Sequence, residues 1–281
     1  MKIAYFRIIG NDLPPRHVKG QSLLNLTYQL DNEPEFDEID KFWVINRILD
    51  SAERDRIISI LTLRGKSFYE IDINPETYAK QTTFDQKVNY LTNVNGARNF
   101  CIDCGFNAKY DVVLPFDGNC FFTLEGWLYA RNSIASNFLS PYFIFPMARC
   151  KSYDDLAVQP QIKELYTMGN MKRHDLTEPQ IGFGVDYDLK FNENFPYGKA
   201  SKIELLWRLG IPGIWEFWYP KEQAAALQAP SEYATRQPVY AGYVFRLPSG
   251  NVGAESNNVI RGEVRSEGLV NLVKEADSLL L

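Results

Sequence analysis

Residues 110–119 read YDVVLPFDGN, and this stretch decides the fold class that the sequence predicts. Its first six residues form an apolar run bounded by polar residues, which is typical of a strand buried on both faces. Asp117 and Asn119 then place a carboxylate and an amide oxygen two residues apart at the end of that strand. Gly118 between them would leave room for a closely approaching ligand. Taken alone, the tripeptide favours a plain turn, so its position in the chain has to decide its meaning.

The chain before this stretch alternates between strand-like and helix-like patterns. The strand-like patterns span residues 2–9, 41–46 and 67–73, and the helix-like patterns span residues 20–32, 51–63 and 95–108. We expect Ser51 to be the N-cap of the second helix. Alternation of this kind predicts an α/β fold with a mostly parallel central sheet flanked by helices. Ligands bind to such sheets at the carboxyl ends of the strands, where polar clusters fall at residues 10–17, 46–50 and 117–119.

The second half of the chain is less regular. A strand-like pattern at 142–148 is followed by a loop-rich polar stretch at 150–198, a helix-like pattern at 201–209, a strand-like pattern at 240–247 and a closing amphipathic helix at 269–280. The first half therefore predicts the central sheet, and the second half adds a part whose organisation is not evident from the pattern.

The composition is that of an ordinary globular protein, since 45% of the 281 residues are hydrophobic and 23% are charged. A net charge of −5 argues against the basic surface that nucleic-acid binding needs, so no nucleic-acid partner is expected. The first apolar run meets Arg7 and Asp12 too early for a signal peptide, and no segment reaches the length of a membrane span. We expect a cytoplasmic protein, and peripheral contact with the inner face of a membrane is compatible with this. Four cysteines in so long a chain predict reduced thiols.

Residues 95–99, NGARN, open the helix that precedes the YDVVLP strand. Gly96 at a helix N-terminus, followed by Arg98, combines exposed backbone donors, the positive end of the helix dipole and a guanidinium. All three favour an anionic phosphate. The alternative is a helix start with a surface arginine.

NGARN and LPFDGN together resemble the nucleotide-sugar-binding half of GT-A fold glycosyltransferases, where a G-x-x-x-x-R-N-like helix start precedes a strand ending in an Asp-x-Asp-type motif. Asn119 stands where the second aspartate usually stands, which keeps an oxygen ligand but removes a charge. A closer resemblance, to the galactofuranosyltransferase-like proteins of phosphoglycan assembly, rests on RIIGNDLPPRH, WVINRILD, YLTNVNGARN, LPFDGN, EPQIGF and YVFRLPSG.

The resemblance implies a GT-A fold and transfer of a sugar from a nucleotide diphosphate donor to a glycan or glycolipid acceptor in polysaccharide biosynthesis. We expect a UDP-linked donor, with UDP-galactofuranose as one candidate. Residues 1–130 would be the donor-binding half, and residues 131–281 the acceptor-binding half and C-terminal segment of the same globular unit. Mn²⁺ or Mg²⁺ is the expected cofactor, because oxygen ligands suit these ions and a metal would stabilise the leaving diphosphate. The expected metal ligands are Asp117, Asn119 and His174.

The expected donor-binding residues lie at the strand ends and at the NGARN helix start: Arg7, Gly10, Asn11, Asp12, Arg16, Asn46, Arg47, Asn95, Gly96, Arg98, Asn99, Asp117 and Asn119. An inverting transfer also needs a carboxylate that takes the proton of the acceptor hydroxyl. Glu178 is the first candidate for this base and Asp186 the second. Glu178 also suits the start of a helix, since Thr177 and Pro179 fit an N-cap and a first turn.

Three further arginines, Arg246, Arg261 and Arg265, lie in the C-terminal segment, where they would serve either as anion contacts or in surface salt bridges. Two other functions stay open. A sugar nucleotidyltransferase would carry a glycine-rich basic loop after its first strand, which GNDLPPRH fits poorly. A non-catalytic glycan- or nucleotide-binding module is compatible with Asn119 in place of an acidic residue.

Overall fold

The computed structural model describes residues 1–158, 176–199, 201–210 and 239–281. Within this part of the chain, nine strands form one sheet in the order β3-β2-β1-β4-β7-β6-β9-β5, with β8 beside β6. The strands are β1 (Ile3–Ile9), β2 (Ile39–Asn46), β3 (Ser67–Ile71), β4 (Val112–Asp117), β5 (Cys120–Phe121), β6 (Tyr142–Arg149), β7 (Leu176–Gly184), β8 (Val239–Tyr240) and β9 (Val244–Arg246). The helices of eight or more residues are α1 (Gln21–Asn32), α2 (Ser51–Leu63), α4 (Phe84–Thr92), α5 (Val94–Asn107), α6 (Leu124–Ser136), α8 (Ser201–Arg208) and α11 (Asn258–Leu280). The shorter ones are α3 (Pro75–Ala79), η1 (Tyr153–Val158) and α10 (Val252–Ser256).

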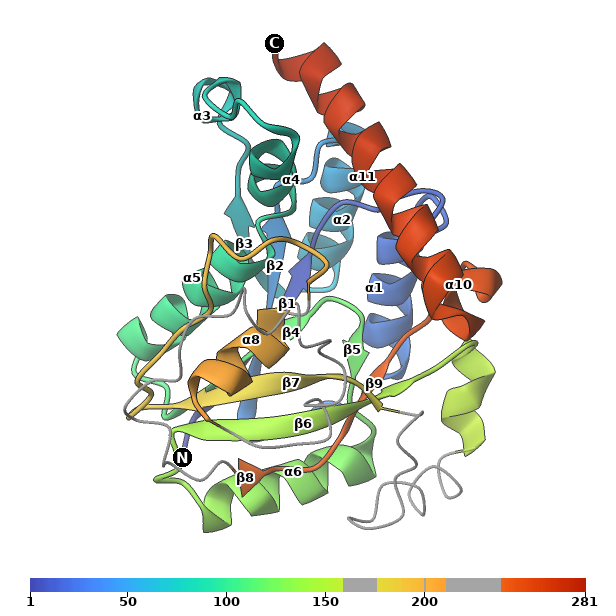
Figure 1. Ribbon diagram of the computed structural model, residues 1–281. Coiled ribbons are helices and arrows are strands. Elements are labelled where there is room, and N and C mark those ends of the chain that lie inside the picture. The colour runs from blue at the N-terminus through green and yellow to red at the C-terminus, as the bar shows by residue number, and fades with distance from the viewer. Residues whose placement is uncertain (159–175, 200, 211–238) are drawn as a thin grey trace.

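The strands β3, β2, β1 and β4 are mutually parallel, and β1 has β2 on one side and β4 on the other. The strand order therefore reverses between β1 and β4, which makes a crevice at their carboxyl ends. The sheet continues with β7, antiparallel to β4, and β6, antiparallel to β7. Figure 1 shows β6 and β7 crossing the four parallel strands at a steep angle. The expected α/β fold with a mostly parallel central sheet is confirmed, and the structure adds the antiparallel pairings of β7 with β4 and β6.

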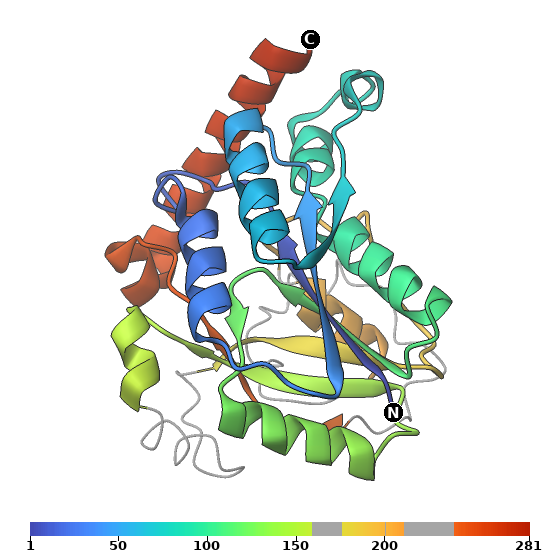
Figure 2. The same cartoon turned by 180° about the vertical axis from the view of Figure 1, so that it is seen from behind.

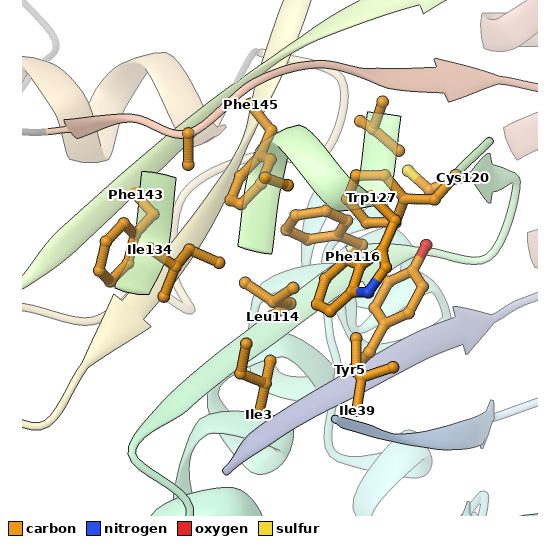
Figure 3. Packing of buried hydrophobic residues seen from close by; sticks show 14 of the residues in the cluster. Ile3, Tyr5, Ile39, Leu114, Phe116, Cys120, Trp127, Ile134, Phe143 and Phe145 are labelled. Carbon is orange, nitrogen blue, oxygen red and sulfur yellow. The ribbon is translucent and has the colours of Figure 1, made fainter. Parts of the chain in front are cut away.

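Both faces of β1 are buried, as expected for a central strand of a parallel sheet. Tyr5 packs with Phe116 and with Trp127 of α6 in the largest hydrophobic cluster, shown in Figure 3. Phe6, on the other face, packs against Cys101 of α5. The helices α1 and α2 pack on β1 and β2, and Figure 2 shows them in front of these strands. These layers hold the carboxyl ends of β1 and β4 in fixed positions.

Several expected boundaries are wrong for local reasons. Asp50, and not Ser51, is the N-cap of α2, because its side chain accepts a hydrogen bond from the backbone N–H of Glu53. The expected strand at 240–247 is split into β8 and β9 around Gly242, whose φ of 113° breaks the extended chain. The strand β7 runs through the stretch expected to be loop-rich, so Thr177 and Pro179 lie in a strand and do not begin a helix.

The boundary expected at residue 130 lies inside α6, and β4 pairs with β7 across it. The C-terminal helix α11 starts earlier than expected and packs on α3 and α4 (Figure 1). Asp277 of α11 accepts hydrogen bonds from Tyr78 at 2.6 Å and Lys87 at 2.7 Å. All four cysteines are free thiols, as expected. Among the helices that the structure describes, none is long and apolar enough to cross a membrane.

Candidate anion-binding site

A cavity of about 550 Å³ lies at the carboxyl ends of β1 and β4, where the strand order reverses. Its walls come from both halves of the chain, including the β1–α1 loop, the start of α5, the β4–β5 turn, β7, α8, β9 and α11. The predicted site residues that line it are Gly10, Asn11, Asp12, Asn46, Asn95, Gly96, Arg98, Asp117, Asn119 and Glu178. The polar strand ends that the sequence predicted to meet do lie together around one cavity.

Asparagine side chains hold the loops at the mouth of the cavity in place. Asn11 donates from Nδ2 to the carbonyl of Arg47 and accepts from the N–H of Leu49, both at 2.7 Å. Asn46 accepts from Nδ2 of Asn93, the residue that precedes α5, at 2.9 Å. These bonds join the end of β2 to the β1–α1 loop and to the start of α5. The two amides brace the loops that form the walls.

Asp117 is the centre of a charged cluster at the cavity wall. Its Oδ1 accepts from Nη2 of Arg98 at 2.7 Å, and its Oδ2 accepts from Nζ of Lys202 at 2.7 Å and from Nε2 of Gln180 at 2.9 Å. The Arg98 and Lys202 side chains are only 4% and 2% exposed, whereas the Asp117 side chain is 30% exposed. Burial alone would raise the pKa of Asp117, but Lys202 and Arg98 outweigh it and hold that pKa well below its usual value. The carboxylate therefore stays ionised.

The two cations that bind Asp117, Arg98 and Lys202, are positioned by the helices on which they lie. Arg98 lies in the first turns of α5, and its Nη1 also donates to Oδ1 of Asn95 and to Oγ of Ser201. Lys202 lies in the first turn of α8. Its backbone N–H donates to Oε1 of Glu178 at 2.8 Å, so Glu178 satisfies one of the free N–H groups at the start of that helix. The two helix starts and β7 thus meet at the Asp117 carboxylate.

The residues around Asp117 do not fit a divalent metal in this arrangement. Each carboxylate oxygen of Asp117 already faces a buried cation, and the cluster of Asp117, Arg98 and Lys202 carries a net positive charge. In the part of the chain that the structure describes, no three His, Cys, Asp or Glu side chains are grouped to hold a metal. His174, the expected third ligand, lies outside the described residues. The expected Mn²⁺ or Mg²⁺ stays a prediction.

The cavity as a whole is rich in cations. Its lysine and arginine residues are Arg98, Arg149, Lys199, Lys202, Arg246, Arg261 and Arg265. Among the residues that the structure describes, the carboxylates that line the cavity are Asp12, Asp117, Glu178 and Glu193. Arg246 lines the cavity from β9, and Nη1 of Arg265 donates to the carbonyl of Gly198 at 3.2 Å. The excess of cations contrasts with the net charge of −5 of the whole chain, and it creates a field that attracts anions.

Comparison with known proteins adds little to this description. No family model matches the sequence, and no curated protein matches it. Among solved structures, the chain is similar to the crystal structure of S. aureus TarS 1-349, with 12% sequence identity and a TM-score of 0.43 over 99% of this chain and 72% of that one. This likeness is too weak to carry an argument. The assignment of the fold rests on the sheet itself.

Four expected donor-binding residues lie outside the cavity: Arg7, Arg16, Arg47 and Asn99. Arg7 is 1% exposed because it pairs with the buried carboxylate of Glu33 and lies over the ring of Tyr5. The other three hold neighbouring loops, since Arg16 donates to Ser249, Arg47 to the carbonyl of Tyr90 and Asn99 to the carbonyl of Phe191. The structure thus places these four side chains outside the cavity and bonded to neighbouring parts of the fold, and their role as donor contacts stays a prediction.

The structure also shows the surroundings of two further residues that the sequence singled out. Asp186 follows β7 at its far end, because Gly184 pairs with Val112 at the start of β4, so Asp186 lies at the opposite edge of the sheet from Asp117. Gly118 lines the cavity, and a Cβ there would lie 2.4 Å from the carbonyl oxygen of Ile8. The glycine therefore also lets the turn after β4 approach the backbone of β1.

Sequence reasoning missed Lys202, Gln180, Arg149, Lys199 and Glu193. Gln180 belongs to the EPQIGF string, so the resemblance contained a signal for it. Lys202 carried no local signal, because it stands at the start of an ordinary amphipathic helix. Only the antiparallel course of β7 brings that helix to Asp117.

Proposed function

We propose that this chain is a glycosyltransferase that moves a sugar from a nucleotide diphosphate donor to a glycan acceptor. The observation that carries the proposal is the cation-rich cavity at the β1–β4 switch point, lined by Asp117 and Glu178. Lysine and arginine side chains in such a cavity bind the diphosphate and stabilise its charge as it leaves. The resemblance noted in the sequence favours a UDP-linked sugar, with UDP-galactofuranose as one candidate.

Glu178 is the proposed base. Its Oε1 accepts the N–H of Lys202, which orients the carboxylate at the cavity wall, and Oε2 would take the proton of the acceptor hydroxyl. The hydroxyl oxygen then bonds to the anomeric carbon as the bond from that carbon to the diphosphate oxygen breaks. The diphosphate leaves with the electron pair of that bond. Direct displacement of this kind inverts the anomeric centre.

Release of nucleotide from a panel of nucleotide sugars, measured with mixed saccharide acceptors, tests the proposal. A UDP-sugar should also raise the melting temperature, because it binds only the folded state. Glu178→Gln should keep this thermal shift and lose most of the turnover. Asp186→Asn is the matched control, since Asp186 lies at the other end of β7, and it should leave both unchanged.

Other outcomes would point to other functions. Pyrophosphate release from UTP and a sugar phosphate, with no transfer from nucleotide sugars, would favour a nucleotidyltransferase. Donor binding without turnover in any condition would favour a binding module. No thermal shift and no turnover with any donor would refute the proposal.

A further inference from the structure

The coordination of Asp117 leaves little place for a metal at the position where the sequence motif predicts one. A carboxylate offers about four lone-pair sites, and three of those of Asp117 are engaged by Arg98, Lys202 and Gln180. A Mg²⁺ ion binds carboxylate oxygens at about 2.0–2.1 Å. To reach Oδ2, the ion would have to displace the ammonium group of Lys202.

Displacing Lys202 is costly because its side chain is 2% exposed. A buried ammonium group that loses its carboxylate partner is left as an uncompensated charge in a poorly hydrated place. Adding a divalent ion would also increase the positive charge of a cluster in which two cations already share one carboxylate. Both effects oppose metal binding at Asp117.

Lys202 is at the same time placed to do what a metal would do. Its ammonium group has three donors, and one of them is directed to Asp117, so two remain for oxygens of a ligand in the cavity. Because Asp117 binds the ammonium group of Lys202, and Glu178 accepts a hydrogen bond from its backbone N–H, the charge is ordered before a ligand arrives. Arg246 from β9 adds a cation from another side of the cavity. A diphosphate would thus meet fixed positive charge without a metal.

We propose that Lys202, which Asp117 binds as it also binds Arg98, compensates the negative charge of the diphosphate in place of a divalent metal. The site then binds a nucleotide diphosphate in the absence of metal. This inference rests on the proposed function, since it concerns the diphosphate of the same donor. Asp117 is then a positioning residue that holds two cations, and Lys202 is the residue that contacts the phosphate and stabilises the leaving group.

Calorimetric titration of the full chain with UDP tests the inference. The dissociation constant should be the same, within about twofold, in excess EDTA and in millimolar MnCl₂ or MgCl₂. In EDTA, Lys202→Met should weaken UDP binding by about tenfold or more, because it removes a charge-assisted hydrogen bond. Lys202→Arg should recover part of this loss. Lys190→Met is the matched control, since Lys190 pairs with Asp103 outside the cavity, and it should bind UDP normally.

The comparison between EDTA and metal uses the unaltered chain, so it decides the matter even if Lys202→Met fails to fold. Binding of UDP that requires Mn²⁺ or Mg²⁺ would overturn the inference and leave the proposed function standing. Absence of UDP binding in both conditions would overturn both. Metal-independent binding that is unchanged in a folded Lys202→Met variant would refute the role of Lys202.

Discussion

Replacement of Asp117 by alanine should destabilise the fold strongly, apart from any effect on turnover. The change leaves Arg98 and Lys202, which are almost fully buried, without the carboxylate that they share. Removing one partner of a buried ion pair costs about 3–5 kcal/mol. Asp117 is partly exposed, so water screens some of the interaction, and we expect a loss of about 3 kcal/mol.

Urea unfolding at pH 7 would measure this loss, and thermal melts should show a decrease of about 6–12 °C. Asp103→Ala is the matched control, because Asp103 forms an exposed pair with Lys190 at 2.7 Å, and it should cost less than about 1 kcal/mol. A loss below about 1 kcal/mol for Asp117→Ala as well would refute the reasoning, since the two cations would then not depend on the carboxylate.

The pH dependence of this stabilisation follows from the direction of the shift. Although burial opposes ionisation of Asp117, Lys202 and Arg98 lower its folded-state pKa well below the usual value. A group with a depressed pKa stabilises the fold above the unfolded-state value, about 3.9 for aspartate, and the stabilisation is lost as the pH falls through the folded value. The difference between the parent chain and Asp117→Ala should therefore be constant between about pH 5 and 8 and shrink only in strong acid.

Three further predictions concern the stability of the fold that surrounds the cavity. Gly118→Ala should cost about 1–3 kcal/mol in urea, because the new Cβ would clash with the carbonyl of Ile8; an unchanged midpoint would contradict the close approach. Burial, and then neighbouring carboxylates, raise the pKa of Glu53 to about 7, so the parent should lose stability as the pH rises from about 4.5 to 7. Glu53→Gln should lack that loss and be more stable by about 1–2 kcal/mol at pH 8, and identical pH profiles would refute it. Asp277→Asn should weaken the partly exposed ion pair with Lys87 and lower the free energy of unfolding by about 0.5–1 kcal/mol. Amide hydrogen exchange in α11 should become faster, and unchanged exchange would argue that apolar packing alone holds that helix.

The position of the cavity could be predicted from the sequence because it depends on a general property of parallel sheets. Buried runs such as residues 112–116 identify central strands, and the carboxyl ends of parallel strands meet at one edge. Asp117 follows from that geometry, and Arg98 follows from the pattern of a helix start at residues 95–99. Arg7 did not, because its partner Glu33 is distant in sequence and no local pattern shows that the pair is buried. A charged residue in an apolar strand was therefore taken for a ligand contact.

The second half of the site could not be predicted, because the direction of β7 decides it. Glu178 and Asp186 are close in sequence, and the pattern around them is polar and contains a proline, which hides a strand. Once β7 runs antiparallel to β4, its first residues lie at the cavity and its last residues lie at the opposite edge of the sheet. The first and second candidates for the base, Glu178 and Asp186, are thereby separated.

The bond between Arg98 and Asp117 gives the two sequence motifs a joint meaning. Read separately, NGARN suggested a guanidinium for phosphate, and the residues after β4 suggested a carboxylate for metal. In the fold the guanidinium of Arg98 and the carboxylate of Asp117 bind each other, so neither is wholly available for the role it suggested. The other oxygen of the carboxylate binds Lys202 from the second half of the chain. The carboxylate leaves a net positive charge on the cluster and fixes both cations at the wall of the cavity. Asn119 is consistent with the same logic, because a second aspartate beside Asp117 would reduce the positive charge that the cavity presents.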